Sequence, residues 1–157
     1  MRRILLAVDD SPAGVAAARA AVQLAIECAA QLRAVHVVTD GELTRTLATR
    51  PGPAHIHPGR ASRTPAVLHF VSELAEHASV PVQTVLLEGH PARCVIREAV
   101  VWSADVIVLG RSGEHRLGQP YVGSQAQHVM EFAEIPVLVV PPLPQGGPSD
   151  PPTTSPK

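Results

Sequence analysis

Lysine, aromatic residues and net charge are all scarce in this sequence. Lys157 is the one lysine, so twelve of the thirteen basic residues are arginine, and the formal net charge is −1. A chain without a broad basic face cannot neutralise many phosphates, which argues against nucleic acid as the main partner. Because aromatic residues make up only 3% of the chain, the core is expected to consist of Val, Leu, Ile and Ala.

Cysteines and long apolar runs are scarce too. Cys28 and Cys94 are the two cysteines, and two cannot build a disulfide framework. Both fall within helical patterns, where we interpret them as small buried apolar residues rather than reactive thiols. No apolar run approaches the roughly 20 residues of a membrane-spanning helix, and the first run is too short for a signal peptide. These absences favour a cytoplasmic protein that does not enter a membrane.

What the sequence does contain is an alternation of short apolar runs and helical patterns. This alternation predicts a parallel β-sheet with helices on both faces, an α/β fold. The expected strands are residues 4–8, 35–38, 82–87, 106–109 and 137–140. The expected helices begin at Ser11-Pro12, Thr64-Pro65, Pro91 and Gly123-Ser124, with Ser11 as an N-cap. Their expected inward residues are Val15, Ala18, Val22, Ala25, Ile26, Ala29, Val67, Leu68, Val71, Leu74, Ala75, Ala78, Val95, Ile96, Ala99, Val100, Ala126, Val129, Met130 and Ala133.

Two segments depart from this alternation. Residues 41–63 are rich in proline, glycine and polar residues, so they are expected to form a connection, with a turn or two of helix at 42–49. From residue 141 onward, seven of the seventeen residues are proline. We therefore expect one domain over residues 1–142 and a disordered or polyproline-like tail over 143–157.

The stretch VLGRSGEHRLGQPYVGSQAQHV, residues 108–129, places several glycines between a strand and a helix. A helix N-terminus attracts phosphate, and glycines let the backbone approach it closely. Ser124 and Gln127 also match a capping box, which needs no ligand, so both interpretations stay open. The loop is neither a P-loop, since it has no lysine, nor a G-x-G-x-x-G dinucleotide loop.

The spacing of these glycines resembles a known motif. Gly110-x-x-Gly113, nine residues and then Gly123-Ser124 is similar to the G-2x-G-9x-G-[S/T] motif of the nucleotide-binding branch of the universal stress protein family. The resemblance extends from about Arg3 to Pro141 through ILLAVDDSP, AVHVV, LEGHPARCVIREAV, ADVIVLGRSG and IPVLVVP. It implies a single doubly wound, Rossmann-like sheet of five parallel strands in the order 3-2-1-4-5. In such sheets ligands bind where the winding reverses, here between the first and fourth strands.

The resemblance also implies roles for individual residues. Asp9 would contact the nucleoside, the Val37 backbone would meet the adenine edge and Leu109 would pack near the base. Phosphates and ribose would be held by Gly110, Gly113, Gly123, Ser124 and the Gln125 N–H. Taken alone, Asp9 equally suits a turn or helix cap and Val37 a core position. Gln125 stands where a small β-branched residue is usual, and Pro120 lies within the spacer.

These implications lead to an ATP-binding stress-response regulator, with ATP bound with or without Mg²⁺ and cyclic AMP as the alternative ligand. We assign no catalytic residue and expect at most slow ATP hydrolysis. The rivals are an enzyme that uses Asp9 with Arg111, His115 or Arg116, and a protein-interaction module without a nucleotide.

The last strand and the remaining histidines complete the expectations. By resemblance, residues Val137 to Val140 form an edge strand that pairs with a second copy in a homodimer. His55 and His57 are interpreted as surface residues, since no Cys or carboxylate nearby completes a metal site. His36 is expected in the second strand, at a core or edge position.

Overall fold

The protein is a five-stranded parallel sheet between two layers of helices. The computed structural model describes residues 1–39, 65–111 and 122–143. The strands are β1 (Arg3–Ala7), β2 (Gln31–Val38), β3 (Val82–Glu88), β4 (Val106–Gly110) and β5 (Val137–Val140). They lie in the order β3-β2-β1-β4-β5 and pair parallel throughout. The expected order 3-2-1-4-5 is therefore confirmed, and the winding direction of the sheet reverses between β1 and β4.

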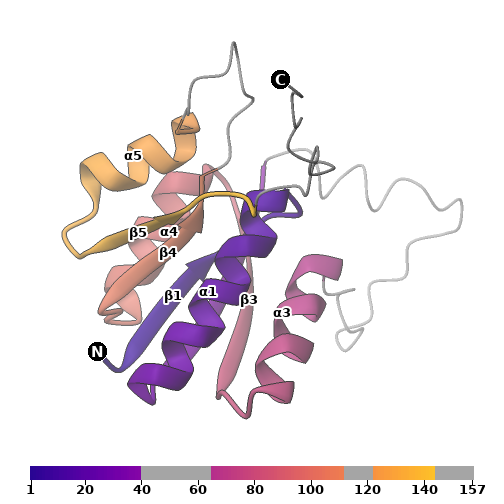
Figure 1. Cartoon of the computed structure of the whole chain (residues 1–157). Coiled ribbons are helices and arrows are strands. Elements are labelled where there is room, and N and C mark those ends of the chain that lie inside the picture. Colours follow the sequence, from indigo (N-terminus) through magenta and orange to yellow (C-terminus); the bar gives the residue numbers. More distant parts are fainter. Residues whose placement is uncertain (40–64, 112–121, 144–157) are drawn as a thin grey trace, which may run out of the picture.

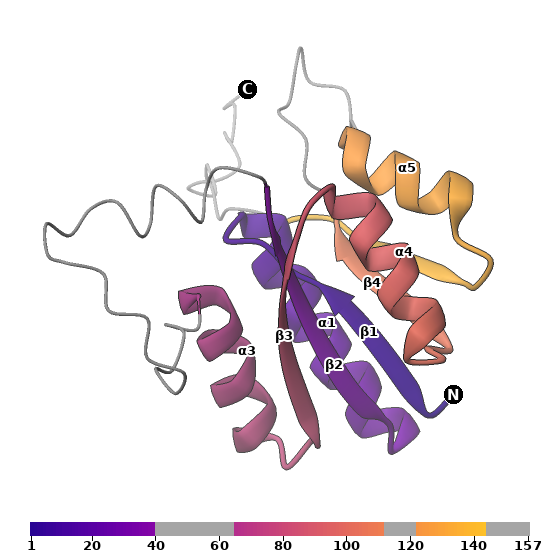
Figure 2. The same cartoon turned by 180° about the vertical axis from the view of Figure 1, so that it is seen from behind.

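Four helices are described, two on each face of the sheet. They are α1 (Pro12–Cys28), α3 (Ala66–His77), α4 (Pro91–Val101) and α5 (Ser124–Phe132). Figure 1 shows α1 and α3 on the near face of the sheet, and Figure 2, from behind, shows α4 and α5 on the other. The predicted connection 41–63, residues 144–157 of the predicted tail, and His55, His57, Gly113, His115, Arg116 and Pro120 lie outside the described residues.

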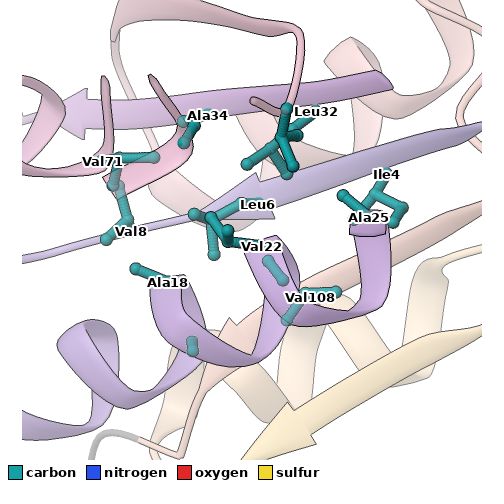
Figure 3. Close-up of a cluster of buried hydrophobic side chains, with 14 of the residues drawn as sticks. Ile4, Leu6, Val8, Ala18, Val22, Ala25, Leu32, Ala34, Val71 and Val108 are labelled. Carbon is teal, nitrogen blue, oxygen red and sulfur yellow. The ribbon is translucent and has the colours of Figure 1, made fainter. Parts of the chain in front are cut away.

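The hydrophobic core has two layers, one on each face of the sheet. Successive side chains of a strand point to opposite faces, so each strand contributes to both layers. On the α1 and α3 side, Ile4, Leu6 and Leu32 pack against the helices (Figure 3). On the α4 and α5 side, Leu5 and Ile107 do the same. The α1 residues on the sheet are mostly alanine, so this helix lies close to the strands. The expected aliphatic core is confirmed.

The start of α1 also agrees with expectation. The Ser11 hydroxyl accepts a hydrogen bond from the Gly14 N–H at 3.0 Å, and Pro12 occupies the first helical position. A serine cap satisfies one of the otherwise unpaired N–H groups of the first turn, and proline has no N–H to lose there. This capped start fixes the turn that connects β1 to α1.

Several expected inward residues are instead exposed. Ile26, Val100 and Met130 are 48%, 64% and 43% exposed, and Ala29 is the exposed C-cap of α1 with φ 48°. A helix turns by about 100° per residue. Ile26 therefore points about 100° away from the inward-facing Ala25, toward solvent. The sequence periodicity therefore predicted too wide an apolar face for α1, α4 and α5, but not for α3.

Asp105, just before β4, fastens the N-terminus of β1. Its Oδ2 accepts the Arg2 N–H at 2.5 Å and the Arg3 N–H at 3.0 Å. The hydrogen bond from Arg2, then that from Arg3, favours the ionised carboxylate and lowers the pKa of Asp105 from its usual 3.8. The folded pKa thus lies below the unfolded one, so the stabilisation is present above the unfolded value and is lost as pH falls through the folded one.

Replacing Asp105 by asparagine, which keeps an acceptor oxygen but no charge, should therefore lower the free energy of unfolding at neutral pH. The gap in unfolding free energy between wild type and Asp105→Asn should begin to narrow as the pH falls below about 4, where the carboxylate of the unfolded chain becomes protonated, and should narrow further toward the lower pKa of the folded protein. Urea unfolding of both proteins from pH 7 to pH 3 measures this gap. A gap that stays constant across the range would mean that the charge contributes nothing.

Candidate functional site

A pocket opens where the winding of the sheet reverses. It lies at the carboxyl ends of β1, β2 and β4 and at the N-termini of α4 and α5, and it encloses about 220 Å³. Crevices at this position are the usual ligand sites of doubly wound sheets. The lining residues are Ala7, Val8, Asp9, Val35, His36, Val37, Pro91, Ala92, Val95, Leu109, Gly110, Gln125, Ala126 and Val129. The wall is mostly apolar, with polar groups at its edges.

Asp9 lies at the pocket edge and also holds the turn after β1. Its Oδ1 accepts hydrogen bonds from the N–H and the hydroxyl of Ser11, whose oxygen in turn caps α1. The turn-forming interpretation of Asp9 is thus confirmed for one carboxylate oxygen. No hydrogen bond to Oδ2 is recorded within the described residues. A Cβ on Gly14 would collide with the Asp9 carbonyl and carboxylate oxygens, so glycine is required beneath this turn.

The main chain of Val37 extends past the end of β1. Hydrogen bonds alternate sides along a strand: the Val35 carbonyl accepts the Val8 N–H, whereas the Val38 carbonyl accepts the Gly89 N–H after β3. The N–H and C=O of Val37 therefore face the β1 side, where β1 ends at Ala7. They offer one donor and one acceptor to the pocket.

Gly110, at the end of β4, and Gly123, at the start of α5, have different structural roles. A Cβ on Gly110 would lie 2.5 Å from the Ala13 carbonyl carbon and 2.8 Å from the Gly14 nitrogen. Gly110 thus lets the end of β4 approach the start of α1. Gly123 is the N-cap of α5, and Ser124 is the first helical residue.

The predicted capping box of Ser124 and Gln127 is wrong, because the helix begins one residue earlier than that motif requires. No side chain of the described residues caps α5, and its first intrahelical bond is donated by Gln127 to Gly123. The N–H groups of Ser124, Gln125 and Ala126 have no partner within the helix. Gln125 and Ala126 line the pocket, so this helix N-terminus faces it.

The sequence as a whole decides the family. Residues 1–141 match the sequence model of the Universal stress protein family. The chain belongs to this family.

Relatives and solved structures agree with that assignment. Universal stress protein MJ0531 of Methanocaldococcus jannaschii is 31% identical over 150 residues, covering 88% of this chain and 81% of its own length. A universal stress protein in complex with cAMP superposes with a TM-score of 0.66 at 18% identity, covering 90% of this chain and 97% of that one. The Archaeoglobus fulgidus protein in complex with dAMP gives 0.62 at 18%, covering 89% and 98%. At such identities the two structures establish the fold alone.

In this universal stress protein, Gln125 has a side-chain contact that sequence reasoning missed. Its Oε1 accepts the Ala92 N–H at 3.3 Å, which joins the N-terminus of α4 to that of α5 across the pocket. Only the backbone N–H of Gln125 was expected to matter. The sequence analysis also did not predict that α4 forms a wall of the pocket, through Pro91, Ala92 and Val95. The signal that was available is Pro91, which starts a helix directly after a strand and so lies at the carboxyl edge of the sheet.

Of the remaining expected site residues, Leu109 is buried and lines the pocket. Five of the eight expected residues line the pocket, namely Asp9, Val37, Leu109, Gly110 and Gln125. Gly123 and Ser124 directly precede Gln125 at the start of α5, and Gly113 lies outside the described residues. The described residues contain no group of three potential metal ligands. They also include no helix with the length and apolar character needed to span a bilayer.

Proposed function

We propose that this universal stress protein binds an adenine nucleotide in the switch-point pocket and acts as a ligand-controlled regulator. One observation carries the proposal: the same pocket is bordered by the main chain of Val37, which faces the β1 side, and by the N-terminus of α5, which no side chain of the described residues caps. The first suits the edge of a base and the second suits phosphate. A nucleotide carries both.

Val37 would recognise the base. Adenine presents a ring nitrogen that accepts and a 6-amino group that donates, side by side. This pair complements the N–H and C=O of one extended residue. Guanine carries a 6-oxo group in place of the amino donor, so its edge meets the Val37 C=O with another acceptor. Leu109 and Val95 would pack on the faces of the ring.

The sugar and phosphates would lie toward the helix termini. The Asp9 carboxylate has one oxygen engaged by Ser11, and the other would accept a hydrogen bond from a ribose hydroxyl. Ser124 and the first N–H groups of α5 would hold phosphate, where the helix dipole favours negative charge. Gly110 and Gly123, which with Gly113 are the glycines of the motif, would let the main chain approach the phosphate closely.

ATP, with or without Mg²⁺, is the ligand we favour, and cyclic AMP is the alternative. The cAMP and dAMP complexes of structurally similar universal stress proteins support adenine in this fold. We assign no catalytic residue, since the polar groups of the pocket position charge rather than activate a nucleophile. A cytoplasmic homodimer that pairs through β5 completes the proposal.

Filling the pocket tests the proposal. Ala92 is 1% exposed and lines the pocket, so Ala92→Leu should place three more carbons in the base site and weaken ATP binding at least tenfold. Ala99→Leu is the matched control, because Ala99 lies on the same helix but lines a separate apolar hollow. Calorimetric titration with ATP, ADP, AMP and cyclic AMP measures both. Equal affinities in the two variants would place the nucleotide elsewhere, and no binding by wild type would reject the proposal.

A further inference from the structure

The imidazole of His36 occupies an unusual place at the end of the β1–β2 ladder. Its Nδ1 lies 2.8 Å from the Val8 carbonyl oxygen. A carbonyl can only accept, so Nδ1 carries the proton and donates it. His36 was expected to be a satisfied core or edge histidine of the second strand, and its place in β2 with a hydrogen-bonded ring is confirmed. What was not expected is that it lines the pocket together with Val8 and Val37.

The Val8 carbonyl is the acceptor that Val37 would otherwise use. Gln31 donates to Arg2 and Val8 donates to Val35, and in a parallel ladder the next bond would run from the Val37 N–H to the Val8 carbonyl. Among the described residues no such bond is recorded. The imidazole takes its place.

We propose that His36 is a positioning residue for the base: by engaging the Val8 carbonyl, it ends the ladder one bond early and leaves the Val37 N–H for the adenine ring. This inference rests on the proposed function and adds to it the residue that makes the base-reading donor available. His36 does not touch the base in this role. It selects for a ligand with an acceptor at the ring nitrogen beside the amino group.

Two substitutions separate this role from a merely structural one. His36→Phe keeps a flat ring but has no donor, so the Val37 N–H should close onto Val8. His36→Asn keeps a donor, because its amide nitrogen is as far along the side chain as Nδ1. Amide exchange followed by NMR should show a fast-exchanging Val37 N–H in ligand-free wild type and His36→Asn, and a protected one in His36→Phe.

Ligand analogues then report the donor directly. We expect wild type to bind ATP roughly tenfold more tightly than either 1-deaza-ATP or 7-deaza-ATP, whichever lacks the nitrogen that accepts from Val37. His36→Phe should bind ATP about tenfold less tightly and bind that analogue unchanged, so the discrimination disappears. His36→Asn should retain it. The midpoint of urea unfolding of His36→Phe should not fall, since the ladder gains a bond.

The outcomes are distinguishable. If His36→Phe discriminates as wild type does, or if it loses ATP and both analogues equally, His36 does not present the Val37 donor. If wild type prefers ATP over neither analogue, the Val37 N–H does not read the base, and the inference is rejected while adenine binding stands. If wild type binds none of the three, the proposed function itself is rejected, and the base-positioning role with it.

Discussion

Replacing Gly110 by alanine should lower the free energy of unfolding by about 3 kcal/mol, the upper end of the usual cost of overpacking. The new Cβ would lie 2.5 Å from the Ala13 carbonyl carbon and 2.6 Å from its oxygen. Both obstacles are backbone atoms, which cannot turn away as a side chain can. Either β4 or the start of α1 must shift. Chemical denaturation of the variant and the wild type measures the loss.

Nucleotide binding should fall together with stability. Gly110 borders the pocket, and the start of α1 that it touches also carries the turn of Asp9. A shift of either element moves two walls of the site, so ATP affinity should drop even at temperatures where Gly110→Ala is fully folded. Unchanged stability in this variant would show that β4 and α1 do not approach so closely.

Replacing Ala29 by glycine should have the opposite effect on the free energy of unfolding. Ala29 ends α1 in the left-handed region, with φ 48° and ψ 46°, where a Cβ is unfavourable and glycine is the usual residue. Ala29→Gly should therefore raise the free energy of unfolding by up to about 1 kcal/mol. Glycine should thus be favoured over alanine at both positions, at Gly110 because a Cβ has no room and at Ala29 because of the backbone conformation. Elsewhere alanine is usually the more stabilising of the two, through the lower entropy of the unfolded chain.

Most of the fold could be predicted from the sequence, because its signals are local. The apolar run after Arg3 and the Ser11-Pro12 start of α1 depend on neighbours in the chain, and both are confirmed. The order of the strands came from the family resemblance, since periodicity does not say which strands pair. The start of α5 at Gly123-Ser124 is confirmed. The sequence did not decide which of the two residues is the N-cap, because both suit that position and only the backbone path separates them.

The residues of the site also differ in how far the sequence could predict them. Asp9 and Gly110 were foreseen from the family resemblance, whose strand order brings the ends of the predicted strands 4–8 and 106–109 together at the reversal point. The side-chain contacts of His36 and Gln125 were not, because they depend on register and on the approach of residues far apart in the chain. His36 reaches Val8 only because β2 extends beyond β1. Such a contact has no local sequence signal.

The outer edge of β5 is the expected contact surface between two copies of the protein. The Pro136 and Val140 carbonyls accept hydrogen bonds from β4 and the residue after it. By alternation, the N–H and C=O groups of Val137 and Val139 face outward from the sheet. Leu138 beside them is 42% exposed. An apolar edge whose outward main-chain groups have no recorded partner among the described residues favours pairing with another strand, and a second copy would satisfy both edges about a two-fold axis.

Val139→Pro should therefore convert the proposed dimer to a monomer. Proline removes an outward N–H while leaving the bonds to β4 intact, and edge strands tolerate it. Because a two-fold axis repeats each contact, the substitution removes the hydrogen bond of the Val139 N–H twice per dimer. The dissociation constant should therefore rise roughly a hundredfold or more. Val139→Ala is the matched control, since it shortens the same side chain but keeps the N–H, and it should remain dimeric. Analytical ultracentrifugation over a concentration series reads both; a monomeric wild type, or a Val139→Pro variant that still dimerises, would mean that β5 is not the interface.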